Sequence, residues 1–85
     1  MIGKLQRNVR AIHDLERAVR VWEMGRDSVQ QALNEEITCC EKQGGSIESN
    51  PVVAEARSNI ATFITFIVAA KARIDELERG NQKQT

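Results

Sequence analysis

The chain has 85 residues, enough for one small domain, and aliphatic side chains supply most of its 41% apolar residues. Twelve basic and twelve acidic side chains cancel, which argues against a general polyanion binder. Two adjacent cysteines make no disulfide framework, and no apolar leader is present, so we expect a reduced, cytoplasmic protein.

The segment 2–42 predicts a long amphipathic helix. Its apolar residues recur at spacings of three and four, the period of one helix face. Gly25 interrupts this pattern, and a glycine inside a helix costs about 1 kcal/mol relative to alanine. The helix is therefore either continuous, kinked at Gly25, or broken there to give a three-helix bundle. We favour the long helix because the apolar stripe continues on both sides: Ile2, Leu5, Val9, Ile12, Leu15, Val19 and Trp22, then Val29, Leu33, Ile37 and Cys40.

The segment 43–50 predicts the turn between two helices. Gly44 and Gly45 are typical of a helix end, since glycine accepts the left-handed conformation of a C-terminal cap. Asn50 and Pro51 are typical of a helix start, as N-cap and first-turn residue.

The second predicted helix spans 51–79, with Gly80 as its end and 81–85 as a polar tail, so that 1–80 forms one helical domain. Its heptad positions a and d are all apolar, which indicates a helix packed along its whole length. Those positions are Val53, Ile60, Ile67 and Ile74 (a) and Ala56, Phe63, Ala70 and Leu77 (d).

A short connection makes the two helices antiparallel neighbours, so the predicted fold is an all-α helical hairpin. At 1.5 Å per residue the first helix outreaches the second by about a dozen residues. Further apolar residues also widen the second helix beyond its seam. These two groups predict an interface for self-association into a multi-helix bundle, as a dimer or higher oligomer: Ile2, Leu5, Val9, Ile12, Trp22, Ile64, Phe66 and Val68.

Candidate chemistry is sparse in this sequence. His13 is the single histidine, and its surroundings lack the ligand spacing of a metal site, so no metal or cofactor is expected. No nucleophile lies in a pattern with a base, which predicts a protein that is not an enzyme. The run 60–70 is eleven residues, shorter than the roughly 20 of a membrane span, so no membrane contact is expected.

Three functional hypotheses follow from these features. The first is a non-catalytic, self-associating helical protein that binds another protein as an adaptor, small chaperone or inhibitor. The second is a nucleic-acid-binding accessory protein, whose candidate anion-contacting face is Arg7, Arg10, Arg17 and Arg20. The third is an oligomeric bundle that encloses a small ligand or metal.

Overall fold

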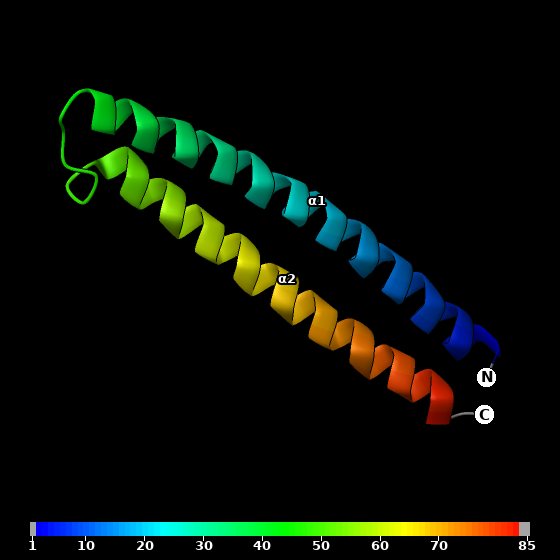
Figure 1. The fold of residues 1–85 in the computed structure, drawn as a ribbon. Helices are drawn as coiled ribbons and strands as arrows, with labels where there is room; N and C mark the ends of the chain where they lie inside the picture. The colour runs from blue at the N-terminus through cyan, green and yellow to red at the C-terminus, as the bar shows by residue number, and fades with distance from the viewer. Residues whose placement is uncertain (1, 84–85) are drawn as a thin grey trace.

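The computed structural model describes the backbone of residues 2–83 and the side chains of residues 7–80. Over these residues it contains two helices, α1 (Ile2–Lys42) and α2 (Pro51–Lys83). The helices run side by side in opposite directions, which brings the two ends of the chain to the same end of a rod (Figure 1). The principal-axis extents of the rod are 63 × 15 × 14 Å. The predicted all-α fold with two helices packed against each other is confirmed, and its assembly into a multi-helix bundle stays a prediction.

α1 is continuous through Gly25, so the alternative in which the chain folds back there as a third helix is wrong. A bend at Gly25 stays a prediction. Gly25 has another role, because it packs against the ring of Phe63. A Cβ atom added to Gly25 would lie 2.8 Å from Cζ of Phe63 and 3.0 Å from Cε1. The absence of a side chain therefore lets the two helices approach closely at this level.

The turn between the helices is built as the sequence predicts. Gly44 has a φ of 72°, and its amide donates to the carbonyl oxygen of Glu41, while the amide of Gly45 donates to that of Cys40. These two bonds form a Schellman motif, which satisfies carbonyls that the helix end leaves free. Asn50 then caps α2, because its Oδ1 accepts the amide of Val52 at 2.9 Å.

The core is the seam between the two helices. The eight predicted a and d positions of α2 are all buried or half-buried, and every other residue of 51–79 is exposed. At the centre, Val19 of α1 packs with Ile67 and Ala70 of α2. Half-buried Leu15, Trp22 and Ile74 surround this cluster. The heptad frame is therefore confirmed, and it fixes which face of α2 meets α1.

The predicted C-terminal end of α2 is wrong. Gly80 does not stop the helix, which continues to Lys83, while the last two residues of the expected tail lie outside the described residues. The four additional residues lengthen α2 by about 6 Å. Ile12 is buried, with 7% of its surface exposed, whereas the sequence placed it in an uncovered overhang; one heptad before Val19, it lies at the level of Ile74 and Leu77 of α2. The overhang is shorter than predicted.

Candidate interaction surface

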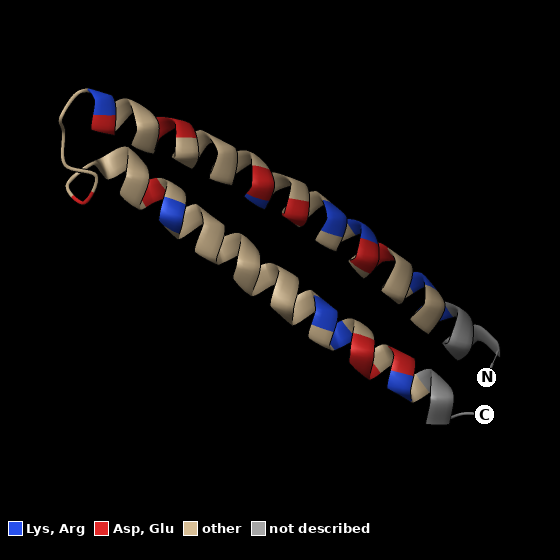
Figure 2. Cartoon of the chain, viewed as in Figure 1, with Lys and Arg blue, Asp and Glu red and all other residues tan. Residues whose placement is uncertain are grey.

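The middle of α2 carries no charged side chain on any of its faces. No charged residue occurs between Arg57 and Lys71, and this uncharged stretch is the longest on either helix in Figure 2. The two threonines within it donate their hydroxyls to the helix's own backbone: Thr62 to Ser58 O at 3.1 Å and Thr65 to Ala61 O at 2.9 Å. Their hydrogen-bonding demand is thus met internally. We call residues 60–70 the apolar band.

α1 covers only one side of the apolar band. Ile67 and Ala70 face α1 and are 5% exposed, whereas Ile64, Phe66 and Val68 are 44%, 48% and 61% exposed. Successive residues of a helix are rotated by about 100°, so Ile64 and Phe66, two residues apart, lie on opposite flanks of the seam. Exposed apolar surface therefore extends along both flanks of α2. A large exposed apolar patch on a soluble protein marks a site of contact with another molecule.

The same property makes α2 a candidate membrane span by length and composition. Among the described residues, Pro51–Gly80 is the one helical stretch that meets this criterion. Core helices of soluble proteins meet it too, but most of their apolar window is buried, while only 11% of this window is. Length and composition alone therefore do not test the expectation of no membrane contact. The low buried fraction shows that the hairpin itself leaves most of this apolar window uncovered.

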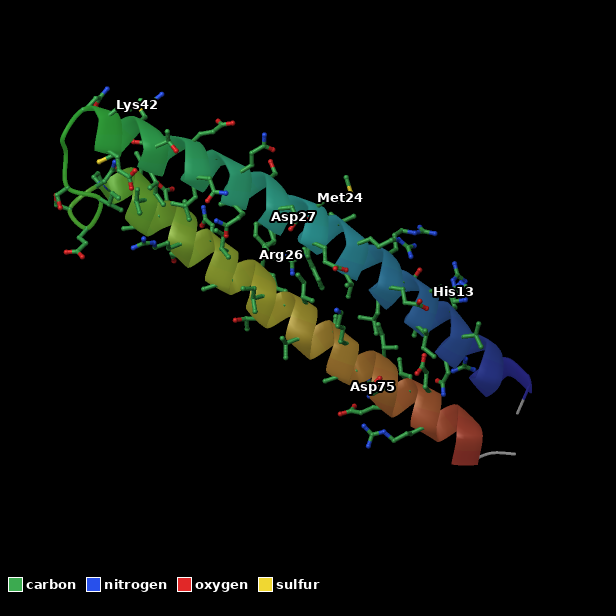
Figure 3. The ribbon with its side chains drawn as sticks, in the orientation of Figure 1. His13, Met24, Arg26, Asp27, Lys42 and Asp75 are labelled. Carbon is green, nitrogen blue, oxygen red and sulfur yellow. The ribbon has the colours of Figure 1, made fainter. Side chains whose placement is uncertain are left out.

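The segment of α1 opposite the apolar band covers it unevenly: Val19 packs on Ile67 and Ala70, but a charged residue occupies another position of this segment. Arg26 lies between the two helices (Figure 3), with 33% of its side chain exposed and its Nε 3.2 Å from Oδ1 of Asp27. Trp22 adds an apolar contact beside the Val19 cluster, since its ring lies 5.5 Å from that of Phe66, centroid to centroid, at an angle of 42°. One flank of the band is thus partly covered by an aromatic pair.

The predicted interface residues fall into three groups. Ile64, Phe66 and Val68 are exposed together on α2, and Val9 is 46% exposed on α1. Ile12 is buried within the hairpin, and Trp22 is half-buried against Phe66, so neither is free to form an interface alone. The side chains of Ile2 and Leu5 lie outside the described residues. The sequence analysis missed three further exposed apolar residues: Val21, Met24 and Val52.

The four arginines of the candidate anion-contacting face, Arg7, Arg10, Arg17 and Arg20, are all exposed. None of them forms an ion pair with a described acidic side chain, since the pairs found in residues 7–80 are Arg26–Asp27 and Arg73–Glu76. His13, which points away from α2 (Figure 3), lines a shallow depression together with Glu16, Arg17 and Arg20. A carboxylate within this face opposes contact with phosphate groups.

The two cysteines differ in exposure, as expected for neighbours on a helix. Cys40 is buried in the seam, and Cys39 is exposed; neither is in a disulfide. Cys40 also contacts the turn, since a Cβ atom on Gly45 would lie 3.2 Å from its Sγ. Within the described part of the chain, no group of three His, Cys, Asp or Glu residues is placed to hold a metal ion.

No protein family, curated protein or solved structure matches this chain at a significant level. The class that the fold defines is a two-helix antiparallel hairpin whose second helix is covered on one side only. Any functional assignment therefore depends on the physical properties of the apolar band and of the arginine face.

Proposed function

We propose that this protein is a non-catalytic helical interaction protein, which associates with itself through the apolar band of α2 and binds another protein as an adaptor, small chaperone or inhibitor. The observation that carries the proposal is the exposure of Ile64, Phe66 and Val68 in a helix that has no charged residue for three turns. Completing the burial of three half-covered apolar side chains would contribute roughly 1 kcal/mol each, and a symmetric contact counts each of them twice.

The small size of the hairpin core supports the same proposal. Seven hydrophobic side chains are buried among residues 7–80: Ile12, Val19, Leu33, Cys40, Val53, Ile67 and Ala70. A chain of 85 residues with one helix–helix seam has little burial to offset the conformational entropy lost on folding. Association adds a second contact surface to α2 without any new element of structure. Folding and association then stabilise each other.

Light scattering over a micromolar concentration range tests the proposal, with a matched pair of variants. Val68 and Val21 are both 61% exposed, but Val68 belongs to the apolar band and Val21 lies on α1. We expect Val68→Glu to shift the protein towards the 9.5 kDa monomer and Val21→Glu to leave the oligomer intact. A wild-type mass of 9.5 kDa throughout, or an equal response of the two variants, would exclude self-association through the band.

A second candidate function is nucleic-acid binding through the exposed arginine face. The lack of ion-pair partners for these arginines among the described side chains favours it. Glu16 in the same depression and the absence of an aromatic side chain from its lining disfavour it. A salt titration decides, because phosphate contacts weaken binding steeply as salt rises. Binding of DNA or RNA that is independent of Arg10 and Arg17 would exclude this candidate.

A further inference from the structure

The two flanks of the apolar band are both exposed but are not equivalent. On the flank that carries Phe66, the Trp22 ring already covers part of the phenyl group, and Arg73 is paired with Glu76 at 3.0 Å. On the opposite flank Ile64 and Val68 lie four residues apart and share one face. We call this side of α2 the Ile64 flank. Its apolar surface is more uniform than that of the flank that carries Phe66.

The Ile64 flank carries an ordered set of charges. Steps of three and four residues along this face give Arg57, Ala61, Ile64, Val68, Lys71 and Asp75, and all six are exposed. A basic residue stands at one end, two large apolar residues at the centre, and an acidic residue at the other end. Neither Arg57 nor Asp75 forms an ion pair with a described side chain. The terminal charges are therefore available to a partner.

This order of charges is complementary to itself when the partner helix runs in the opposite direction. Arg57 and Asp75 are equally distant from residue 66, and so are Ile64 and Val68. A two-fold axis at the level of residue 66 therefore places Arg57 opposite Asp75 of a second copy, and Ile64 opposite Val68. A parallel arrangement would instead stack like charges on like charges, which is unfavourable.

Lys71 fits the same arrangement. The axis places it opposite Ala61, a small residue over which its alkyl chain can lie while the ammonium group stays in water. Within its own chain Lys71 borders a shallow depression that is also lined by Glu16, Arg20 and Glu23 of α1. The two carboxylates outnumber the one guanidinium there, so α1 presents a net negative charge to Lys71, and the Lys71 charge does not oppose docking of the second copy.

We propose that a second copy of this chain docks on the Ile64 flank, antiparallel and two-fold symmetric about residue 66, with Ile64 facing Val68 and Arg57 facing Asp75. The proposal rests on the self-association proposed above and specifies its face, direction and register. In the resulting dimer α2 lies between α1 on its seam and α2 of the other copy on its flank. The two apolar bands meet at the centre, and the ion pairs close both ends.

A charge-exchange experiment tests this register. Arg57→Glu alone places two acidic side chains opposite each other at both ends of the dimer, and Asp75→Arg alone places two arginines there. We expect each single variant to raise the dimer dissociation constant about tenfold at low ionic strength, because two surface ion pairs turn into two repulsions. An equimolar mixture of the two variants restores both ion pairs in a heterodimer, and its dissociation constant returns to the wild-type value.

Light scattering under reducing conditions measures these constants, with circular dichroism to verify that each variant keeps its helix content. Arg17→Glu, the same change of charge on the outer face of α1, is the matched control, and we expect it to leave the dimer unchanged. A wild-type dimer whose variants do not recover on mixing would overturn the register and leave self-association standing. A monomeric wild type would overturn both proposals.

Discussion

Substitution of Gly25 by alanine has two opposing effects of similar size on the free energy of unfolding. Alanine is a better helix former than glycine by about 1 kcal/mol, and Gly25 lies in the interior of a 41-residue helix. Its new Cβ atom would, however, lie 2.8 Å from Cζ of Phe63, well inside the ordinary carbon–carbon separation of roughly 3.5–4.0 Å. Forcing an extra methyl group into a packed contact typically costs about 1–3 kcal/mol.

We therefore expect Gly25→Ala to lower the free energy of unfolding by about 1 kcal/mol, the overpacking cost less the gain in helix propensity. Denaturation with urea at a fixed chain concentration measures this change, since association adds to the apparent stability. In a Phe63→Leu background the distal ring atoms are gone, and the same substitution should become stabilising. The difference between the two backgrounds measures the coupling of the two residues.

Gly80→Ala is the matched control for this experiment. Gly80 is also helical, and a Cβ atom there would meet no heavy atom within 4 Å. This substitution should raise the free energy of unfolding by up to about 1 kcal/mol, less if the end of α2 frays. If Gly25→Ala stabilises the protein as much as Gly80→Ala does, the close contact between Gly25 and Phe63 does not exist in solution.

Three further predictions concern the core, the arginine face and the turn. Ile67→Ala should lower the free energy of unfolding by about 2–5 kcal/mol, because Ile67 is buried in the central cluster; a melting temperature that barely moves would contradict this. Changing Arg10 and Arg17 together to Gln should change the free energy of unfolding by less than about 1 kcal/mol in urea denaturation, since both are exposed. Asn50→Ala should cost about 1–2 kcal/mol in the same measurement, because Asn50 caps α2 and also donates to Glu36 Oε1 at 3.0 Å; Asn50→Ser, which keeps an uncharged capping oxygen but not the amide donor, separates the two contributions.

The sequence predicts the seam of α2 well because the signal is local and redundant. Eight apolar positions repeat with one period, and a single frame places them all on one face. The turn is equally local, since a left-handed glycine and an Asn-Pro start need no information from elsewhere in the chain. These elements were found at the predicted residues.

Two glycines show where local patterns fall short: the contact of Gly25 was not foreseen, and Gly80 was wrongly predicted to end α2. Gly25 is a contact residue, and its partner Phe63 is identified only when the register between the two helices is known. Gly80 is the residue type that often ends a helix, but it does not adopt the left-handed conformation of a helix cap. Among the described glycines, Gly44 alone has a positive φ. A single glycine costs a helix only about 1 kcal/mol, which the neighbouring turns of α2 can offset.

Only part of the candidate surface could be predicted from the sequence, because the rest depends on how the two helices pack. An excess of apolar residues over the seam predicted exposure of Ile64, Phe66 and Val68, and the structure places all three at the surface. The charges at Arg57 and Asp75 were counted in the sequence but not assigned to a face. Their complementarity follows only after the seam has fixed which residues of α2 point away from α1.

The distribution of polar residues along the seam bears on the self-association proposed above. Glu36 occupies a seam position of α1, but Asn50 satisfies its carboxylate, so the turn end of the hairpin is fixed by a hydrogen bond as well as by packing. Arg26 occupies another seam position, opposite the apolar band, and its ion-pair partner Asp27 is its own neighbour in sequence. A cation at this level contributes little apolar contact to the most apolar part of α2. Cover from α1 is therefore apolar where Val19 meets Ile67 and Ala70 and polar at the level of Arg26, and the association proposed above would add apolar contact to the band at that second level.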